Sequence, residues 1–271
     1  MANSEIMEGI HPSAVISPSA KIGKNVVIGA YSVIGDEVEI GDGSIIGPNA
    51  VVAKWTTVGK ECRIFQFASV GEVPQDLKFK GEKSFTVIGD RTVIREGVTI
   101  HRATGEDNET RIGSDCLLMA YVHIAHNCLL GNKVIMSNLA SCAGHAIVED
   151  RVVIGGMAGV HQFVKIGRNA MVGGMSKLVQ DVVPYTIVDG HPAKVVGLNN
   201  VGISRAGIPL ESRRHIKKAY KILYRSGLSL TEAIAVIEQE VDSCEEVEHF
   251  LRFLRNAERG ICRERRDFEE K

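Results

Sequence analysis

Histidines are the residues of this chain whose type and spacing most clearly suggest chemistry. If residues 18 apart stack on one another, as in a three-sided coil with strands about 4.8 Å apart, four histidines fall within one residue of a single stripe. These four are His101, His126, His145 and His161, if the six extra residues that follow Ile100 are left out when the spacing is counted. His123 precedes His126 by three residues and is expected near the neighbouring corner. A neutral imidazole can act as a general base, donate hydrogen bonds to phosphate or sugar, or bind a metal. The sequence therefore predicts an active-site stripe.

A metal site is the alternative reading of this stripe. Hexapeptide-repeat carbonic anhydrases bind zinc through histidines, some of them from neighbouring subunits. Here no aspartate or glutamate is expected to pair with the stripe and orient it, and the neighbours Asn127, Gly144 and Gln162 are typical of substrate contacts. We therefore favour substrate chemistry without a metal or cofactor, and a zinc-dependent hydratase stays the alternative from a different class.

A six-residue repeat must position these side chains. An aliphatic residue recurs at every sixth position from Ile10 to Val70, from Ile88 to Ile100 and from Ile112 to Leu178, with only Met136 and Cys142 departing from Ile, Leu or Val. This period matches neither a helix, at about 3.6, nor a strand, at about 2, so each hexad is one side of a solenoid coil. The repeat predicts a parallel β-helix over residues 1–191. Likeness to other hexapeptide-repeat proteins makes it left-handed, although the general crossover rule favours the opposite hand.

Glycines, cysteines and two interruptions refine this prediction. The residue after the aliphatic one is often glycine, as in Gly23 and Gly41, which suits a corner that needs positive φ or no side chain. Twelve extra residues within 71–87 and six within 101–111 preserve the phase, so both are expected to be loops that project from a corner and carry function. Four cysteines fall at inward positions and are expected in the core, not in disulfides or metal sites: Cys62, Cys116, Cys128 and Cys142.

Composition and the end of the repeat indicate a second, helical domain over residues 192–271. The net charge is −1 and 44% of residues are hydrophobic, with neither a long apolar run nor a signal-like N-terminus, so a cytoplasmic protein without a membrane span is expected. Helices are predicted at 211–225, 230–241 and 244–258, with capping boxes at Ser229 and Ser243. Residues 205–225 hold seven basic residues against one acid, which suits either an acidic protein partner or a solvated helix face.

The chain resembles the UDP-N-acetylglucosamine O-acyltransferases, the first enzymes of lipid A biosynthesis, over essentially its whole length. The stretches that carry this resemblance are 66–78, 94–102, 123–126, 143–145, 154–157, 161–163, 171–174 and 219–227. The resemblance implies a homotrimer with three sites, each between adjacent prisms. It also implies transfer of an (R)-3-hydroxyacyl group from acyl carrier protein to the 3-hydroxyl of UDP-N-acetylglucosamine, with neither a nucleic acid nor a cofactor involved.

The resemblance also implies roles for single residues. His126 matches the general base, and the backbone N–H of Gly144 matches the oxyanion donor. Positions that match contacts to sugar, diphosphate, acyl group or uridine are Asp76, Lys78, His101, His123, His145, His161, Gln162, Asn199 and Arg205. Gly174 matches the residue that gates acyl length, and Met171 and Met175 are expected to shorten the groove.

Three departures from the family pattern leave alternatives open. Asn127 replaces the aspartate that well-known relatives have beside the base, and Val201 and Ala206 stand where relatives carry Glu and Arg. Some relatives acylate a 3-amino sugar, but His123 favours the hydroxyl acceptor. The sister N-acyltransferase is disfavoured because the repeat already starts at Ile10. A coenzyme A-dependent acetyltransferase is disfavoured by the long first loop and the helical domain, and a purely structural solenoid by the grouped histidines.

Overall fold

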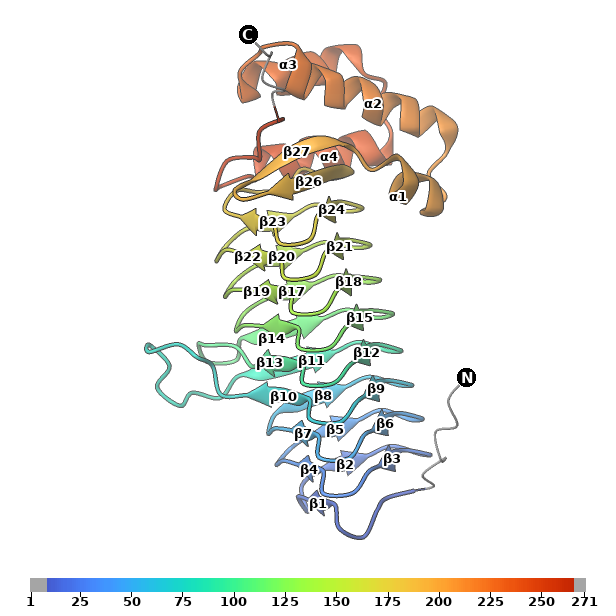
Figure 1. The fold of residues 1–271 in the computed structure, drawn as a ribbon, viewed down its shortest axis with the longest axis vertical. Coiled ribbons are helices and arrows are strands. Elements are labelled where there is room, and N and C mark those ends of the chain that lie inside the picture. Colours follow the sequence, from blue (N-terminus) through green and yellow to red (C-terminus); the bar gives the residue numbers. More distant parts are fainter. Residues whose placement is uncertain (1–8, 266–271) are drawn as a thin grey trace.

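Three parallel sheets form the sides of a prism in the computed structural model, which describes residues 9–265 (Figure 1). The outer ends of the two predicted domains, residues 1–8 and 266–271, lie outside the described residues. The first face consists of β1 (Val15–Ile16), β4 (Val33–Ile34), β7 (Val51–Val52), β10 (Ser69–Glu72), β13 (Thr99–His101), β16 (His123–Ile124), β19 (Ser141–Cys142), β22 (Gly159–Val160) and β25 (Lys177–Leu178).

The other two faces follow the same order along the chain. The second face consists of β2 (Lys21–Ile22), β5 (Glu39–Ile40), β8 (Thr56–Val58), β11 (Phe85–Ile88), β14 (Glu109–Ile112), β17 (Leu129–Leu130), β20 (Ile147–Val148) and β23 (Lys165–Ile166). The third face consists of β3 (Val27–Ile28), β6 (Ile45–Ile46), β9 (Arg63–Ile64), β12 (Val93–Ile94), β15 (Leu117–Leu118), β18 (Ile135–Met136), β21 (Val153–Ile154), β24 (Met171–Val172), β26 (Thr186–Gly190) and β27 (Ala193–Leu198).

The predicted β-helix is confirmed, and the register explains how the two insertions keep the phase. Most coils pair residues 18 apart, as Val15 does with Val33. Ser69 pairs with Thr99 and Thr99 pairs with His123, so the extra residues leave the ladder intact. The first loop (residues 73–84) and the second loop (residues 102–108) both leave the corner between the first and second faces, and the first projects well away from the prism (Figure 1).

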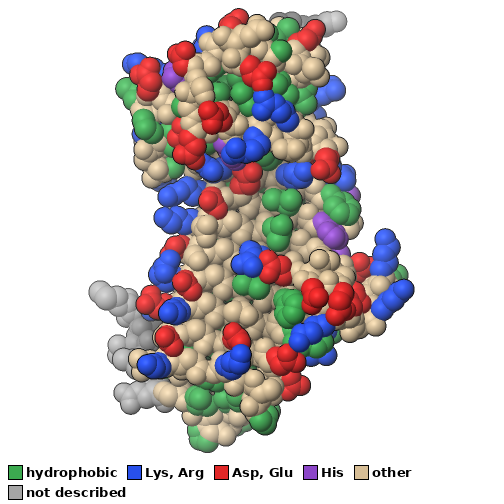
Figure 2. All heavy atoms as spheres, turned by 180° about the vertical axis from the view of Figure 1, so that it is seen from behind, with side chains coloured by type: hydrophobic (Ala, Val, Ile, Leu, Met, Phe, Trp, Pro, Cys, Tyr) green, Lys and Arg blue, Asp and Glu red, His purple; other side chains and the backbone are tan. Residues whose placement is uncertain are grey.

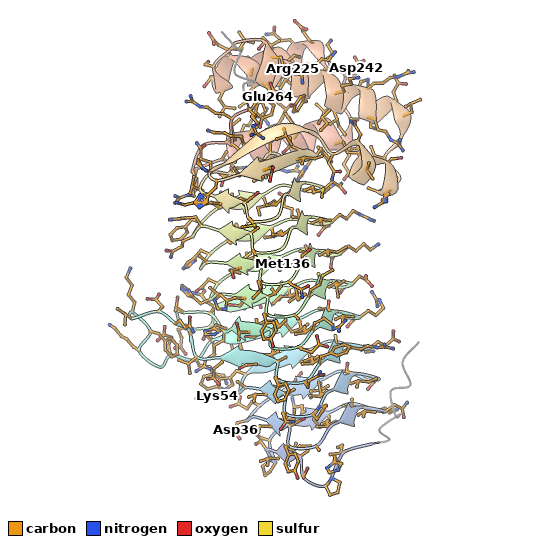
Figure 3. All side chains as sticks on the ribbon, viewed as in Figure 1. Asp36, Lys54, Met136, Arg225, Asp242 and Glu264 are labelled. Atoms are coloured by element: carbon orange, nitrogen blue, oxygen red, sulfur yellow. The ribbon has the colours of Figure 1, made fainter. Side chains whose placement is uncertain are left out.

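The aliphatic row lies inside the prism, as predicted. Ile28, Ile94 and Ile124 are fully buried, and so is Met136, which lies within the coil (Figure 3). The four predicted core cysteines are also buried and free. Each coil buries its aliphatic residues against the coils above and below, so the core is continuous along the prism.

The glycine that often follows the aliphatic residue is explained by its missing side chain and not by a positive φ. Positive φ falls two residues later in the hexad, at residues such as Asn25, Asn127 and His145, and not at Gly41. A Cβ at Gly41 would instead lie 2.6 Å from the backbone carbonyl carbon of Gly59 in the next coil. These glycines are needed because successive coils touch there, and the prediction of positive φ for them is wrong.

The helices cover one end of the prism (Figure 1). They are α1 (Asn200–Arg205), α2 (Leu210–Arg225), α3 (Leu230–Glu240) and α4 (Glu245–Arg255), and α1 was not predicted. The predicted boundary at 191/192 falls inside an antiparallel hairpin of β26 and β27, which continues the strand structure to Leu198 without the six-residue period. Within residues 9–265, no helix has both the length and the apolar character that a membrane span requires.

Of the two predicted capping boxes, only the one at Ser229 forms. Its side chain accepts from the Glu232 backbone N–H, and the Glu232 carboxylate accepts from the Ser229 backbone N–H. The box at Ser243 is wrong, because α4 begins one residue later with Cys244 as its N-cap. Ser243 therefore lies before the cap, and its hydroxyl donates to the Glu248 carboxylate at 2.7 Å.

Candidate active site

A cavity of about 320 Å³ lies on the first face, at the base of the first loop. Strands β13, β16, β19 and β22 form its floor, and the loop contributes Gln75. Histidine side chains gather on the surface beside the projecting loops (Figure 2). The residues that line the cavity are Gln75, His101, His123, Ala125, His126, Ser141, Ala143, Gly144, Gly159 and Val160. The structure thus brings three of the predicted histidines, and the predicted glycine, into one pocket.

His101 and His123 stand side by side in this pocket. Their rings meet edge to face at 5.3 Å, and the Thr99 hydroxyl lies 2.8 Å from His123 Nδ1. His123 is the first residue of the two-residue strand β16, two residues after the corner at Tyr121, and it lines the pocket. Burial lowers the pKa of both imidazoles below the usual value, and the charge of His101 lowers that of His123 further. Both are therefore neutral hydrogen-bonding groups near pH 7.

The imidazole of His126 is held by its neighbour in the corner. Its Nδ1 lies 2.8 Å from Asn127 Oδ1, and the residue is only 8% exposed. Because an amide oxygen can only accept, Nδ1 carries the proton and Nε2 keeps its lone pair. Nε2 lies 3.8 Å from Asp76 Oδ2, on the first loop. The expectation that no acidic residue pairs with the stripe is therefore wrong, since the loop brings Asp76 back over the histidine from fifty residues earlier in the chain.

His145 lies one coil above His126 and packs against it. The two rings meet edge to face at 5.3 Å, and the Phe163 ring stacks on His145 from the next coil at 4.8 Å. Burial lowers the pKa of His145, and the neighbouring His126 lowers it further against the opposing effect of Asp76. This stack confirms that residues about 18 apart lie above one another, and it limits the movement of the His126 ring.

Gly144 completes the arrangement next to His126. A Cβ at this position would lie 2.7 Å from both Cε1 and Nε2 of His126, so only glycine leaves room for the ring. Within residues 9–265 its backbone N–H donates to no backbone carbonyl. The pocket thus holds an imidazole nitrogen with a lone pair beside an unused N–H donor, which is the pair of groups that acyl transfer requires.

Other predicted site residues lie outside this pocket. His161 is exposed one coil above, with its Nδ1 3.1 Å from the Gln162 carbonyl, and Lys78 is exposed on the first loop. Asn199 is buried at the start of α1, where its side chain accepts from the Gly202 backbone N–H and donates to the Asn169 carbonyl. Arg205 lies in the last turn of the same helix.

The three residues predicted to set acyl length lie together on another part of the surface. Met171 is on the third face, and Gly174 and Met175 follow at the corner that leads to the first face. Met171 is 40% exposed and Met175 is 72% exposed. Within the single chain they do not line the cavity.

Thr104 is a site residue that sequence reasoning missed. It lies on the second loop, 23 residues before Asn127, and hydrogen-bonds to the Asn127 side chain. No period or motif relates the two positions, so the contact exists only once the loop has folded back. Within the described residues 9–265, no group of three or more His, Cys, Asp or Glu side chains is arranged to hold a metal ion.

Comparison with known proteins gives a consistent result. A family model described as UDP-N-acetylglucosamine O-acyltransferase, domain 2, matches residues 181–262. A second model, the hexapeptide repeat of succinyl-transferase, matches residues 20–54 and 145–174. Among curated proteins, an acyl-[acyl-carrier-protein]–UDP-N-acetylglucosamine O-acyltransferase of Anaeromyxobacter is 52% identical over 255 residues, which cover 94% of this chain and 99% of that protein.

Solved structures agree over the same length. The UDP-N-acetylglucosamine O-acyltransferase of Moraxella catarrhalis superposes with a TM-score of 0.91 at 40% identity, covering 94% of this chain and 99% of that one. The corresponding enzyme of Francisella novicida superposes with a TM-score of 0.91 at 35% identity, covering 94% of each chain. Both the prism and the helical domain are therefore shared with these proteins.

Proposed function

The chain belongs to the UDP-N-acetylglucosamine O-acyltransferase family, and from this premise we propose how its pocket carries out the transfer. The enzyme transfers an acyl group from acyl carrier protein to UDP-N-acetylglucosamine, the first step of lipid A biosynthesis, and its prism is a left-handed parallel β-helix. We propose that the transferred group is an (R)-3-hydroxyacyl chain and that the acceptor is the sugar 3-hydroxyl. The single observation that carries the mechanism is the lone pair of His126 Nε2 beside the unused N–H of Gly144.

His126 acts as the general base in this proposal. The sugar 3-hydroxyl donates to Nε2, its proton moves to that nitrogen, and its oxygen attacks the thioester carbonyl carbon. The tetrahedral intermediate then collapses to the ester, the carbon–sulfur bond breaks, and the imidazolium returns its proton to the departing thiolate. Asp76, 3.8 Å from Nε2, favours the imidazolium while it exists. The enzyme forms no covalent bond to the acyl group.

Gly144 supplies the oxyanion donor. Negative charge develops on the thioester oxygen in the transition state, and a backbone N–H held beside that atom stabilises it without having to reorganise. The strand pairing of β19 with β22 fixes the coil above, and the Gly144 carbonyl accepts from the Phe163 N–H at 3.2 Å. The peptide around Gly144 is thus held by hydrogen bonds while its N–H is left for the substrate.

Two further histidines of the pocket, and His145 beside it, are proposed to bind substrate as neutral groups. We propose that His101, His123 and His145 contact the sugar or the acyl group, because burial keeps them uncharged. His161 and Gln162, one coil higher, extend the same wall and are proposed to contact substrate there. Asp76 would also accept from a sugar hydroxyl before proton transfer.

The nucleotide is proposed to bind near two basic side chains, Lys78 and Arg205, and near Asn199, the N-cap of α1. Lys78 on the first loop and Arg205 on α1 provide charge for the diphosphate. Asn199 is buried and uses both ends of its amide within the chain, so we propose that it holds α1 in place and thereby positions Arg205 near the uridine and phosphates.

An apolar corner supports the proposed homotrimer. At the corner between the third and first faces, large apolar side chains are exposed in most coils, although Asn49 and Gly97 occupy the same position in two of them. The apolar residues are Tyr31, Phe67, Tyr121, Leu139, Met157 and Met175. Exposed apolar side chains grouped in this way are typical of a contact with another chain. In a closed ring, this corner of one prism would face the first face of the next, and the pocket would lie in the cleft between them.

The same cleft provides a groove for the acyl chain. Met175 belongs to the apolar corner, and Gly174 and Met171 lie beside it. We propose that the acyl chain runs from the pocket along this corner, and that Gly174 leaves the groove open while Met171 and Met175 limit its length. The carbon chain would then be covered by apolar side chains over its whole path.

Helix α2 is the proposed docking surface for the carrier. Arg214, Lys217 and Lys221 are exposed at spacings that place them on one side of the helix. Arg214 reaches Glu211 at 3.7 Å, and for Lys217 and Lys221 no ion pair forms within residues 9–265. Such a basic surface attracts an acidic carrier protein. Because neither a carrier protein nor a charged nucleotide crosses a membrane unaided, we propose that the reaction takes place in the cytoplasm.

Acyl transfer from a series of 3-hydroxyacyl carrier proteins tests this proposal. The protein, treated with a chelator, is incubated with UDP-N-acetylglucosamine, and the products are weighed by mass spectrometry. One added 3-hydroxyacyl group is expected, and the preferred donor measures the groove. His126→Ala should lower the rate by about 10²- to 10⁴-fold without changing the assembly. Near-normal turnover by His126→Ala would remove the assigned base, and product only with a 3-amino acceptor would replace the proposed substrate.

A further inference from the structure

The side chain of Asn127 poses a problem that a carboxylate in its place would not pose. An amide can present either its oxygen or its NH₂ group to the neighbouring imidazole. With the oxygen toward His126 Nδ1, the proton resides on Nδ1 and Nε2 is free to accept. With the NH₂ group there, Nδ1 would have to accept, Nε2 would carry the proton, and the ring could not act as a base in the pocket. Activity therefore depends on what holds the amide in one orientation.

Thr104 holds it through three hydrogen bonds. The Thr104 backbone N–H and hydroxyl both donate to Asn127 Oδ1 at 2.9 Å, and Asn127 Nδ2 donates to the Thr104 carbonyl at 3.0 Å. A backbone N–H can only donate and a carbonyl can only accept, so turning the amide over would set donor against donor and acceptor against acceptor. The orientation of Asn127 is thus determined by Thr104.

The second loop gains a definite role from these contacts. The Glu82 carboxylate of the first loop accepts from the Gly105 N–H in the middle of the second loop at 2.8 Å. Just beyond the second loop, the Thr110 hydroxyl of β14 accepts from the Asn127 backbone N–H at 2.8 Å. The insertion therefore connects the loop that carries Asp76 with the residue that orients the base.

We infer that Thr104 is a positioning residue for the transfer reaction, which keeps Nε2 of His126 free of its proton by holding the Asn127 amide oxygen against Nδ1. The inference rests on the proposed function of His126 as the base. A carboxylate beside the base would keep the proton on Nδ1. Here the uncharged pair Thr104 and Asn127 is inferred to do so. Thr104 itself touches no substrate in this proposal.

Thr104→Val removes one of the two donors that Thr104 provides to Asn127 Oδ1, at nearly constant volume. Thr104→Ser, which retains the hydroxyl, is its matched control. Thr104→Val keeps the two backbone hydrogen bonds to Asn127, so the amide oxygen still faces Nδ1 but is held there less firmly. We expect kcat to fall about tenfold, the equivalent of one lost hydrogen bond, while KM for UDP-N-acetylglucosamine stays within about twofold because no substrate contact is lost. Thr104→Ser should stay within about twofold of the parent. Equal activity of the two variants would overturn the inference.

A double-mutant cycle with Asn127→Leu separates positioning from general damage to the loop. Asn127→Leu removes the acceptor for Nδ1 and should lower kcat by about a hundredfold. If Thr104 acts through Asn127, adding Thr104→Val in that background should cause little further loss. A further tenfold loss there would show that Thr104 serves the loop in another way, and would overturn the inference whatever the stability of the variants.

His126→Ala completes the test. An active His126→Ala would refute the proposed base. An inactive His126→Ala with a fully active Thr104→Val would refute only the role of Thr104.

Discussion

Gly144→Ala is the substitution for which the structure allows the most definite calculation. The added Cβ would lie 2.7 Å from Cε1 and Nε2 of His126, whereas an ordinary contact begins at 3.4 Å. The ring or the peptide must therefore move by about 0.7 Å. Asn127 holds the opposite edge of the ring at 2.8 Å and His145 packs against it, so the movement displaces Nε2. Gly144 is not at positive φ, and alanine there adds no backbone strain.

A displacement of this size has a predictable kinetic cost. Since a misplacement of about 1 Å costs about a hundredfold in rate, Gly144→Ala should lower kcat by about 30- to 100-fold. This corresponds to about 2–3 kcal/mol in activation free energy. The backbone N–H of residue 144 is retained, so KM for UDP-N-acetylglucosamine should change much less than kcat.

The assay measures initial rates of acyl transfer at a saturating concentration of the 3-hydroxyacyl-loaded carrier protein. Gly159→Ala is the control, because it lies in the same pocket and its Cβ would meet no atom of the chain within 4 Å. We expect this control to stay within about threefold of the parent. A Gly144→Ala enzyme that also stays within threefold would refute the calculation, and an equal loss in both variants would show that pocket volume, and not the position of His126, limits the rate.

Three further predictions concern stability, assembly and acyl length. Burial lowers the pKa of His101, His123 and His145 in the folded protein. In the unfolded chain these histidines regain their ordinary pKa of about 6.5, so near and below that pH the unfolded chain binds more protons than the folded one. The free energy of unfolding should therefore fall between about pH 7 and pH 5, and a melting temperature that rises over this range would contradict the argument. Leu139→Glu places a charge in the apolar corner and should shift the assembly toward monomers in sedimentation, whereas an unchanged trimer would exclude that corner from the contact. Gly174→Leu should move the donor preference toward shorter chains by several carbons, and an unchanged preference would exclude Gly174 from the groove.

Much of the fold could be predicted because the repeat is local. Each hexad must bury one aliphatic side chain, so the period alone indicates the coil, the stacking of residues 18 apart and the loops that interrupt it without changing register. The antiparallel hairpin of β26 and β27 and the short α1 were missed, because neither follows the period. The predicted cap at Ser243 failed because a shift of one residue in the start of α4 moves its hydroxyl out of the cap position.

The sequence by itself determined the stripe on which the histidines lie, because stacking depends only on residue spacing. Only the tertiary structure decided that His123, which is not part of the predicted stripe, lines one pocket with His101 and His126, while His161 turns to the carbonyl of its own neighbour. It also decided that Asp76 lies close to His126 and that Thr104 forms hydrogen bonds to the Asn127 side chain. Both contacts arise from loops that fold back over the prism outside the period. Hydrogen-bond direction depends on the positions of single atoms, which residue spacing does not encode.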